Sequence, residues 1–142
     1  MSKEFKRIIL PIDGSDYAKI AARKAFNIAK NRKIDVYAIH VIHQTYFFVK
    51  PEFIQDINKI MVDNANSYLN EIEKIGKEIG LNVIKKIVYG IPYEEIIKFS
   101  EKNDLIVMGN KGKTGLEKIL IGNVAEKVIR HAPCDVLIVK TT

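Results

Sequence analysis

The residues best suited to chemistry in this sequence are glycines next to polar side chains, and they occur in two segments. One segment is Asp13-Gly14-Ser15, and the other begins at Gly109 and includes Gly112 and Gly122. Glycine has no Cβ, so at these positions the backbone can approach a ligand closely or take up positive φ. Backbone N–H groups that approach closely are what a phosphate group requires.

The second segment has further features of a phosphate site. Gly122 and Asn123 open the last helical pattern of the chain, and the free N–H groups and positive dipole of a helix start attract phosphate. Lys111 and Lys113 add positive charge, although we expect Lys113 to be solvated rather than to touch a ligand. Asp13 could accept hydrogen bonds from ribose hydroxyls or hold a metal ion that bridges phosphates; capping of the first helix is an equally weighted alternative.

Two common nucleotide motifs are absent. The GKT sequence at residues 112–114 matches the end of a P-loop, but the position where that motif requires its first glycine is Val107. The glycines at 109, 112 and 115 give the spacing GxxGxxG, whereas dinucleotide-binding folds use GxGxxG. The sequence therefore predicts a phosphate site of another kind.

The remaining polar side chains form no evident catalytic or metal set. His40 and His43 lie three residues apart at a strand end, so we expect them to project to opposite sides. His131 belongs to the last helical pattern, and no Cys, Asp or Glu completes a ligand set around it. Ser15 and Ser100 have no evident His–acid partner. We therefore predict neither a protein-only metal site nor nucleophilic catalysis.

Five short apolar runs and the helical patterns between them must position these residues. The runs cover residues 7–12, 36–42, 83–89, 105–108 and 136–139. They are nearly continuous and rich in β-branched residues, as expected of strands that are buried on both faces. Helical patterns begin near Asp16, at Pro51, near Pro92 and near Val124. This alternation predicts one α/β domain over residues 1–142, a doubly wound parallel sheet with helices on both faces.

The helical patterns also predict which side chains face the core. In the first helix the predicted core stripe is Ile20, Ala21, Ala25, Ile28 and Ala29. The aromatic residues Tyr46, Phe47, Phe48 and Phe53, after the second strand, are expected to be core or a lid that could cover an adenine.

The two glycine segments should meet in space. Both follow predicted strands directly, and in open α/β sheets ligands bind beyond the carboxyl ends of the strands, where the strand order reverses. The segment at 13–15 and the segment at 109–125 are therefore predicted to form one site from residues far apart in the sequence.

Bulk composition narrows the class of protein. The chain has 142 residues, 47% of them apolar and 28% charged, which is typical of a globular protein. No apolar stretch has the length of a membrane span, and the first residues contain no signal core, so we expect a cytoplasmic protein. The net charge of +6 is dispersed, with its densest cluster at Lys30, Arg32 and Lys33, which argues against a nucleic-acid partner. Cys134, the single cysteine, is expected to be a small buried thiol.

Taken together, these residues resemble the universal stress protein family. The pattern G-x2-G-x9-G followed by a small polar residue is similar to that family's ATP-binding signature. ILPIDGS at residues 9–15 resembles its first strand and turn, and GNVAEKVIRHAPCDVLIVK at 122–140 resembles its ending. The resemblance covers the whole chain. It implies a five-stranded parallel sheet in the order 3-2-1-4-5 and a homodimer joined through the last strand, residues 136–139.

The resemblance also implies a ligand, ATP with magnesium or manganese, and the residues that hold it. On the adenine and ribose side it places Pro11, Ile12, Asp13 and, from the second strand, Val41. For the sugar and phosphates it implies Met108, Gly109 and Gly112, next to Lys111. Around the phosphate tail, which the metal bridges, it places Gly122, Asn123, Val124 and Ala125.

Two positions depart from the family pattern and leave three functions open. Asn123 replaces the usual Ser or Thr, and Ala125 lacks a hydroxyl that many nucleotide-binding members have. The first function is an ATP-binding regulatory stress-response module, a switch with slow ATP hydrolysis. The second is an enzyme, a slow ATPase or nucleotidyl transferase that uses Asp13 and a metal. The third is a dimerising stress protein that binds no nucleotide.

Overall fold

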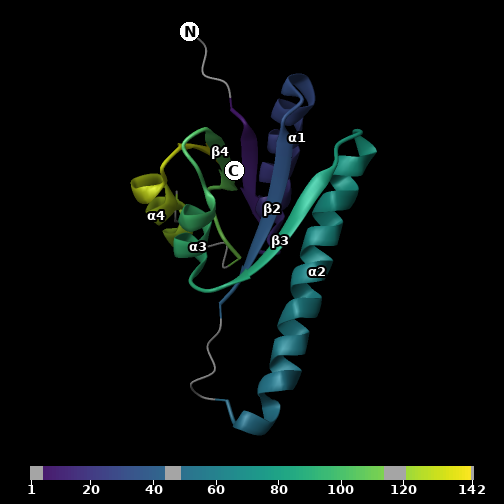
Figure 1. The fold of residues 1–142 in the computed structure, drawn as a ribbon, viewed down its shortest axis with the longest axis vertical. Helices are drawn as coiled ribbons and strands as arrows, with labels where there is room; N and C mark the ends of the chain where they lie inside the picture. Colours follow the sequence, from purple (N-terminus) through teal and green to yellow (C-terminus); the bar gives the residue numbers. More distant parts are fainter. Residues whose placement is uncertain (1–4, 44–48, 114–120, 142) are drawn as a thin grey trace.

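The computed structural model describes residues 5–43, 49–113 and 121–141 (Figure 1). The strands are β1 (Arg7–Pro11), β2 (Asp35–Ile42), β3 (Val83–Tyr89), β4 (Asp104–Gly109) and β5 (Asp135–Val139). The helices are α1 (Asp16–Arg32), α2 (Ile54–Glu78), α3 (Pro92–Phe99) and α4 (Asn123–His131), with the short 3-10 helix η1 (Pro51–Phe53) before α2.

The strands form a parallel sheet in the order β3-β2-β1-β4-β5, which confirms the predicted fold class and strand order. β1 lies at the centre, between β2 and β4, and the chain proceeds outward from it in both directions. The strand order therefore reverses between β1 and β4. A crevice opens at the carboxyl ends of strands at such a switch point.

The helices form two layers, one on each face of the sheet (Figure 1). α1 and α2 cover one face, where Ile8 and Leu10 of β1 pack against Phe26 and Leu69. α3 and α4 cover the other face, where Ile9 of β1 points instead. Successive residues of a strand face opposite sides, so the continuous apolar run of β1 reflects burial on both faces.

The core face of α1 differs in part from the predicted stripe. Its buried residues are Ala18, Ala21, Ala22, Ala25, Phe26 and Ala29. Ile20, which was predicted to face the core, is 45% exposed, and Ile28 is only partly buried against the same cluster. Most of the buried residues of α1 are alanines, whose small side chains let the helix lie close to the sheet, and Ile20 lies outside this buried face.

An ion pair joins β1 to β4 at the amino end of the sheet. Arg7 donates from Nε and Nη2 to the two oxygens of Asp104, at 2.9 and 2.6 Å, and Asp104 is buried. The guanidinium also lies 5.0 Å from the ring centroids of Tyr37 and Phe99. The hydrogen bond to Asp104 raises the pKa of Arg7 above its usual value.

α2 extends beyond the carboxyl end of the sheet (Figure 1). Its buried residues, Ala65, Leu69, Ile72 and Gly76, lie from its middle to its carboxyl end. In the first half Ile60 is 59% exposed. Within the ranges that the structure describes, no helix combines the length and the apolar character needed to cross a membrane.

Candidate functional site

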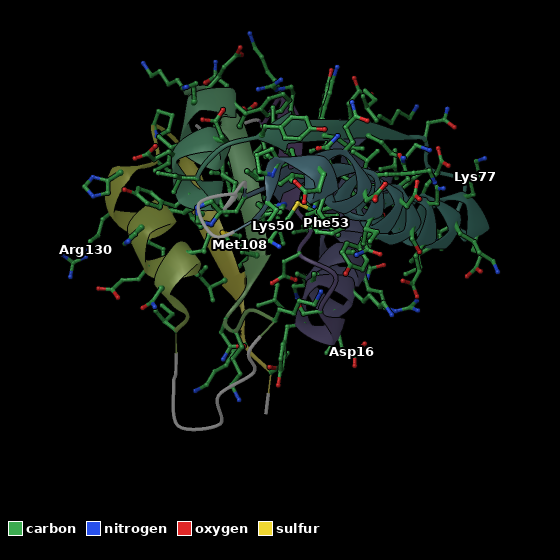
Figure 2. The ribbon with its side chains drawn as sticks, turned by 90° about the horizontal axis from the view of Figure 1, so that it is seen from below. Asp16, Lys50, Phe53, Lys77, Met108 and Arg130 are labelled. Carbon is green, nitrogen blue, oxygen red and sulfur yellow. The ribbon has the colours of Figure 1, made fainter. Side chains whose placement is uncertain are left out.

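A cavity of about 430 Å³ lies at the carboxyl ends of β1, β2 and β4. Figure 2 views this end of the molecule, with Met108 near the middle of the view and Asp16 at the start of α1. The structure brings all of the residues singled out from the sequence to the wall of this one cavity: Pro11, Ile12, Asp13, Val41, Met108, Gly109, Lys111, Gly112, Gly122, Asn123, Val124 and Ala125. Seven further described residues also line it: Ser15, Ala18, Ile39, His40, Pro92, Ile96 and Lys113.

The turn after β1 is built around Asp13 and Ser15. The N–H and the hydroxyl of Ser15 both donate to Oδ1 of Asp13, at 2.9 and 2.6 Å. The Ser15 hydroxyl in turn accepts from the N–H of Ala18 and caps α1. The alternative that Asp13 caps α1 is therefore wrong, because Ser15 does so and Asp13 orients Ser15. Oδ2 of Asp13 lies on the side of Gly112, 3.4 Å from the position that a Cβ would occupy there.

The glycines of the second segment have different roles. At Gly109 a Cβ would lie 3.0 Å from the backbone oxygen of Tyr17, so this glycine lets α1 approach β4. At Gly112 the only described atom within 4 Å of a Cβ is Oδ2 of Asp13, which leaves the backbone open to the cavity. None of these glycines has positive φ, since the described glycines that do are Gly14, Gly80 and Gly90. The lack of a Cβ at these glycines therefore serves close approach to the backbone, and not an unusual φ.

The start of α4 faces the cavity beside Gly112. Gly122 is the N-cap, its N–H donates to the oxygen of Asn110 at 2.7 Å, and no side chain of the described residues caps the helix. The first-turn N–H groups of α4 are thus available to a ligand, with the positive end of the helix dipole behind them. Ala125 packs its methyl group into the core on this face, whereas Val124 is 36% exposed at the cavity wall.

Asn110 is a buried polar residue that sequence reasoning did not single out. Its Oδ1 accepts hydrogen bonds from the N–H and the hydroxyl of Thr141, at 3.1 and 3.0 Å. Its own N–H donates to the oxygen of Val139. Asn110 therefore fixes the glycine loop to the chain that follows β5, a role that only the folded contacts reveal.

His40, Tyr68 and Lys113 form a second group that the sequence did not reveal. Nδ1 of His40 lies 2.6 Å from the oxygen of Ile12, which can only accept, so Nδ1 carries the hydrogen. The ring of Tyr68, from α2, lies edge-on to His40 at 5.5 Å. Nζ of Lys113 donates to the Tyr68 hydroxyl at 2.7 Å and lies 4.9 Å from its ring centroid. Lys113 is exposed, as expected, but it is not simply solvated.

The other predicted groups lie away from the cavity or outside the described part of the chain. His40 faces the cavity while His43 is exposed, and the described residues contain no cluster of three metal-ligating side chains. Tyr46, Phe47 and Phe48 lie outside the described residues, and Phe53 is 51% exposed. Cys134 is only partly buried, against the core beneath α3 and α4, rather than fully buried as predicted.

Comparisons with known proteins agree on one family. The sequence model of the universal stress protein family matches residues 4–140. Universal stress protein MJ0531 of Methanocaldococcus jannaschii is 42% identical over 140 residues, which cover 96% of this chain and 82% of that protein. The solved structure of MJ0577, from the same organism, has a TM-score of 0.87 with 35% identity and covers 97% of both chains. A universal stress protein in complex with cAMP has a TM-score of 0.75 with 25% identity, covering 99% of this chain and 100% of that one.

Proposed function

The chain belongs to the universal stress protein family, and from that premise we propose that it is an ATP-binding regulatory module of the stress response. One observation carries the proposal: two glycine segments about a hundred residues apart line a single cavity at the strand-order switch of the sheet. Occupancy of that cavity would change the contacts of the protein with itself or with partners.

The two ends of the cavity suit the two ends of a nucleotide. Ile39, Val41, Ile96 and Met108 give an apolar surface for a base, and a volume of about 430 Å³ is in the range of small-molecule sites. At the other end, the open backbone of Gly112 and the uncapped start of α4 suit phosphates. A relative whose solved structure holds cAMP supports an adenine nucleotide as the ligand.

The chemistry of the cavity wall fits a magnesium or manganese ion that arrives with the nucleotide. Asp13 is the only carboxylate among the described residues that line the cavity, and its Oδ1 is engaged by Ser15. Its Oδ2 is directed toward Gly112, where it would meet a ribose hydroxyl or the ion. Magnesium is commonly held by one or two carboxylates together with substrate phosphates, so a single carboxylate suffices.

A slow ATPase is the second candidate, and the position of Asp13 beside the phosphate end is what favours it. Catalysis of phosphoryl transfer rests on positioning and electrostatics and needs few dedicated side chains. Under this function ATP turnover copurifies with the protein and disappears in an Asp13→Ala variant. Turnover that separates from the protein on a sizing column would exclude the enzyme.

Two further proposals follow from the same premise. We propose a homodimer joined through β5, because this apolar strand lies at the end of the sheet with β4 as its described neighbour. We also propose that the protein acts in the cytoplasm, where ATP is abundant.

Thermal unfolding of the nucleotide-stripped protein tests the main proposal. Mg-ATP at roughly 100 times its dissociation constant adds about 2.7 kcal/mol of apparent stability. For a chain of 142 residues this corresponds to a rise in Tm of about 8 °C. Mg-GTP is the matched control, and we expect it to give a much smaller shift. No shift with either nucleotide at millimolar concentration would contradict ATP binding and favour the nucleotide-free dimer.

A further inference from the structure

We propose that Lys113, held in place by Tyr68, is a specificity-determining residue that distinguishes adenine nucleotides by the number of their phosphates. The inference rests on the proposed function, because it concerns the same cavity. It assigns to the pair a preference for ATP and ADP over AMP, and it gives a role to two side chains that are 45 residues apart in the sequence.

The contacts of Lys113 fix its ammonium group beside the cavity. Nζ donates to the Tyr68 hydroxyl at 2.7 Å and lies 4.9 Å from the centroid of the same ring. The distance to the centroid follows from the hydrogen bond, so the hydroxyl of Tyr68 is the contact that holds the ammonium group.

In the part of the chain that the structure describes, Lys113 differs from several other lysines because it pairs with no carboxylate. Lys19 pairs with Glu71 at 2.8 Å, and Lys85 pairs with Glu73 at 3.1 Å. Within the described ranges, Lys113 has no carboxylate within ion-pair distance. Among the described residues, no carboxylate therefore occupies the ion-pair position at Nζ that a phosphate would take.

Lys113 also stands where a phosphate tail would leave the nucleoside cavity. It lines that cavity and, together with Ser15, a second polar hollow whose wall also includes Gly14, Asp16 and Tyr17. Gly112, the preceding residue, lines the first cavity only. A single phosphate held at Gly112 and the start of α4 stays within the first cavity, whereas a longer tail extends toward Lys113.

Tyr68 is itself fixed, so Lys113 is oriented before a ligand arrives. The Tyr68 ring lies directly on Gly14, where a Cβ would come within 2.6 Å of ring atoms. The edge of the ring meets His40, which is anchored to the oxygen of Ile12. Orientation before binding lowers the entropy that association costs, and it makes the hydroxyl of Tyr68 a positioning group.

The test compares dissociation constants for ATP, ADP and AMP, measured by calorimetry on the full chain. For Lys113→Met we expect ATP affinity to fall about tenfold while AMP affinity changes less than about twofold. Tyr68→Phe removes only the hydroxyl, and we expect about a threefold loss for ATP with AMP again unchanged. The matched control is Lys127→Met, since Lys127 lies 4.6 Å from the ring of Tyr93 but does not line the cavity. Its affinities should equal those of the parent.

The outcomes separate this inference from the proposed function. Equal loss of AMP and ATP affinity in Lys113→Met, or no loss of either, overturns the phosphate-counting role while ATP binding by the parent still stands. A parent protein that binds none of the three nucleotides overturns both. Lys113→Gln provides a second variant, and the Tm of each unliganded variant shows whether it is folded. A purely structural role of Tyr68 would lower Tm without changing the ratio of ATP to AMP affinity.

Discussion

At the scale of single residues, the cavity depends on glycines, because a side chain at these positions would occupy the space that the ligand needs. A Cβ on Gly122 would lie 3.5 Å from the nitrogen of Gly112, an ordinary contact distance, and Gly122 has φ −73° and ψ 162°. A larger residue therefore fits the backbone at this position but occupies the space next to Gly112. Binding and stability should thus respond separately to substitution here.

Gly122→Val should weaken ATP binding at least about tenfold, because the branched side chain fills the phosphate end. The free energy of unfolding should change by less than about 1 kcal/mol, since the φ and ψ values suit valine. A titration with ATP measures the affinity, and unfolding in urea measures the free energy of unfolding. Undiminished ATP affinity would refute the assignment of this end of the cavity.

Gly14→Ala should destabilise the fold by about 2 kcal/mol through two effects. The residue has φ +86°, which disfavours any side chain, and its Cβ would press on the ring of Tyr68. Gly80→Ala is the matched control, because Gly80 has φ +79° with nothing within 4 Å of a Cβ. We expect Gly80→Ala to cost about 1 kcal/mol in urea unfolding. Equal losses in the two variants would show that the Tyr68 contact contributes nothing.

At the scale of elements, the two ends of the sheet are specialised differently. The carboxyl end carries the cavity, and the amino end carries the ion pair between Arg7 of β1 and Asp104 of β4. Asp104 is almost fully buried, and its carboxylate accepts hydrogen bonds from the guanidinium of Arg7 and from the N–H of Glu101. A substitution at the amino end of the sheet should therefore lower the stability of the fold and leave the ligand site intact.

Arg7→Met should lower the free energy of unfolding by about 3 kcal/mol, because it leaves the buried carboxylate of Asp104 without its partner. ATP affinity should not change when it is measured at a temperature where the variant is folded. Glu101→Gln is the control: its carboxylate is 77% exposed and 4.0 Å from Arg7, so we expect almost no loss. A loss below about 1 kcal/mol in Arg7→Met would mean that the contact between Arg7 and Asp104 contributes little to the stability of the fold.

The elements could be predicted from the sequence because each strand is a short run rich in apolar residues and each helix has an apolar stripe. The predicted core stripe of α1 was right for its alanines and wrong for Ile20. Residue spacing predicts which face of a helix is apolar, but it does not show how closely that face approaches the sheet. Asp13 and Ser15 are two residues apart, and only the folded hydrogen bonds show which of them caps α1. The contact of Tyr68 with Lys113 depends on how α2 lies over the sheet, which no local pattern records.

At the scale of the whole molecule, the two edges of the sheet differ in character. β3 carries Lys85 and Lys86 at one edge, and charged edges resist pairing with another strand. β5 at the other edge has the apolar sequence VLIV after Asp135. This difference favours β5 as the strand that pairs with a second copy of the chain.

Sedimentation should therefore give a dimer at micromolar concentration. Amide hydrogen exchange should show slow exchange for β5 and faster exchange for the outer amides of β3, which serves as the internal control. A monomer in sedimentation, or equally fast exchange at both edges, would contradict the dimer through β5.

The walls of the cavity come from residues spread along most of the sequence, from Pro11 to Ala125. The chain must therefore bring β1, β4 and α4 together before the complete cavity exists. A ligand that needs the finished cavity stabilises the native state more than the transition state of folding. A bound nucleotide should consequently lower the rate of unfolding and leave the rate of folding almost unchanged. The folded state of the nucleotide-bound protein should therefore have a longer lifetime than that of the empty protein.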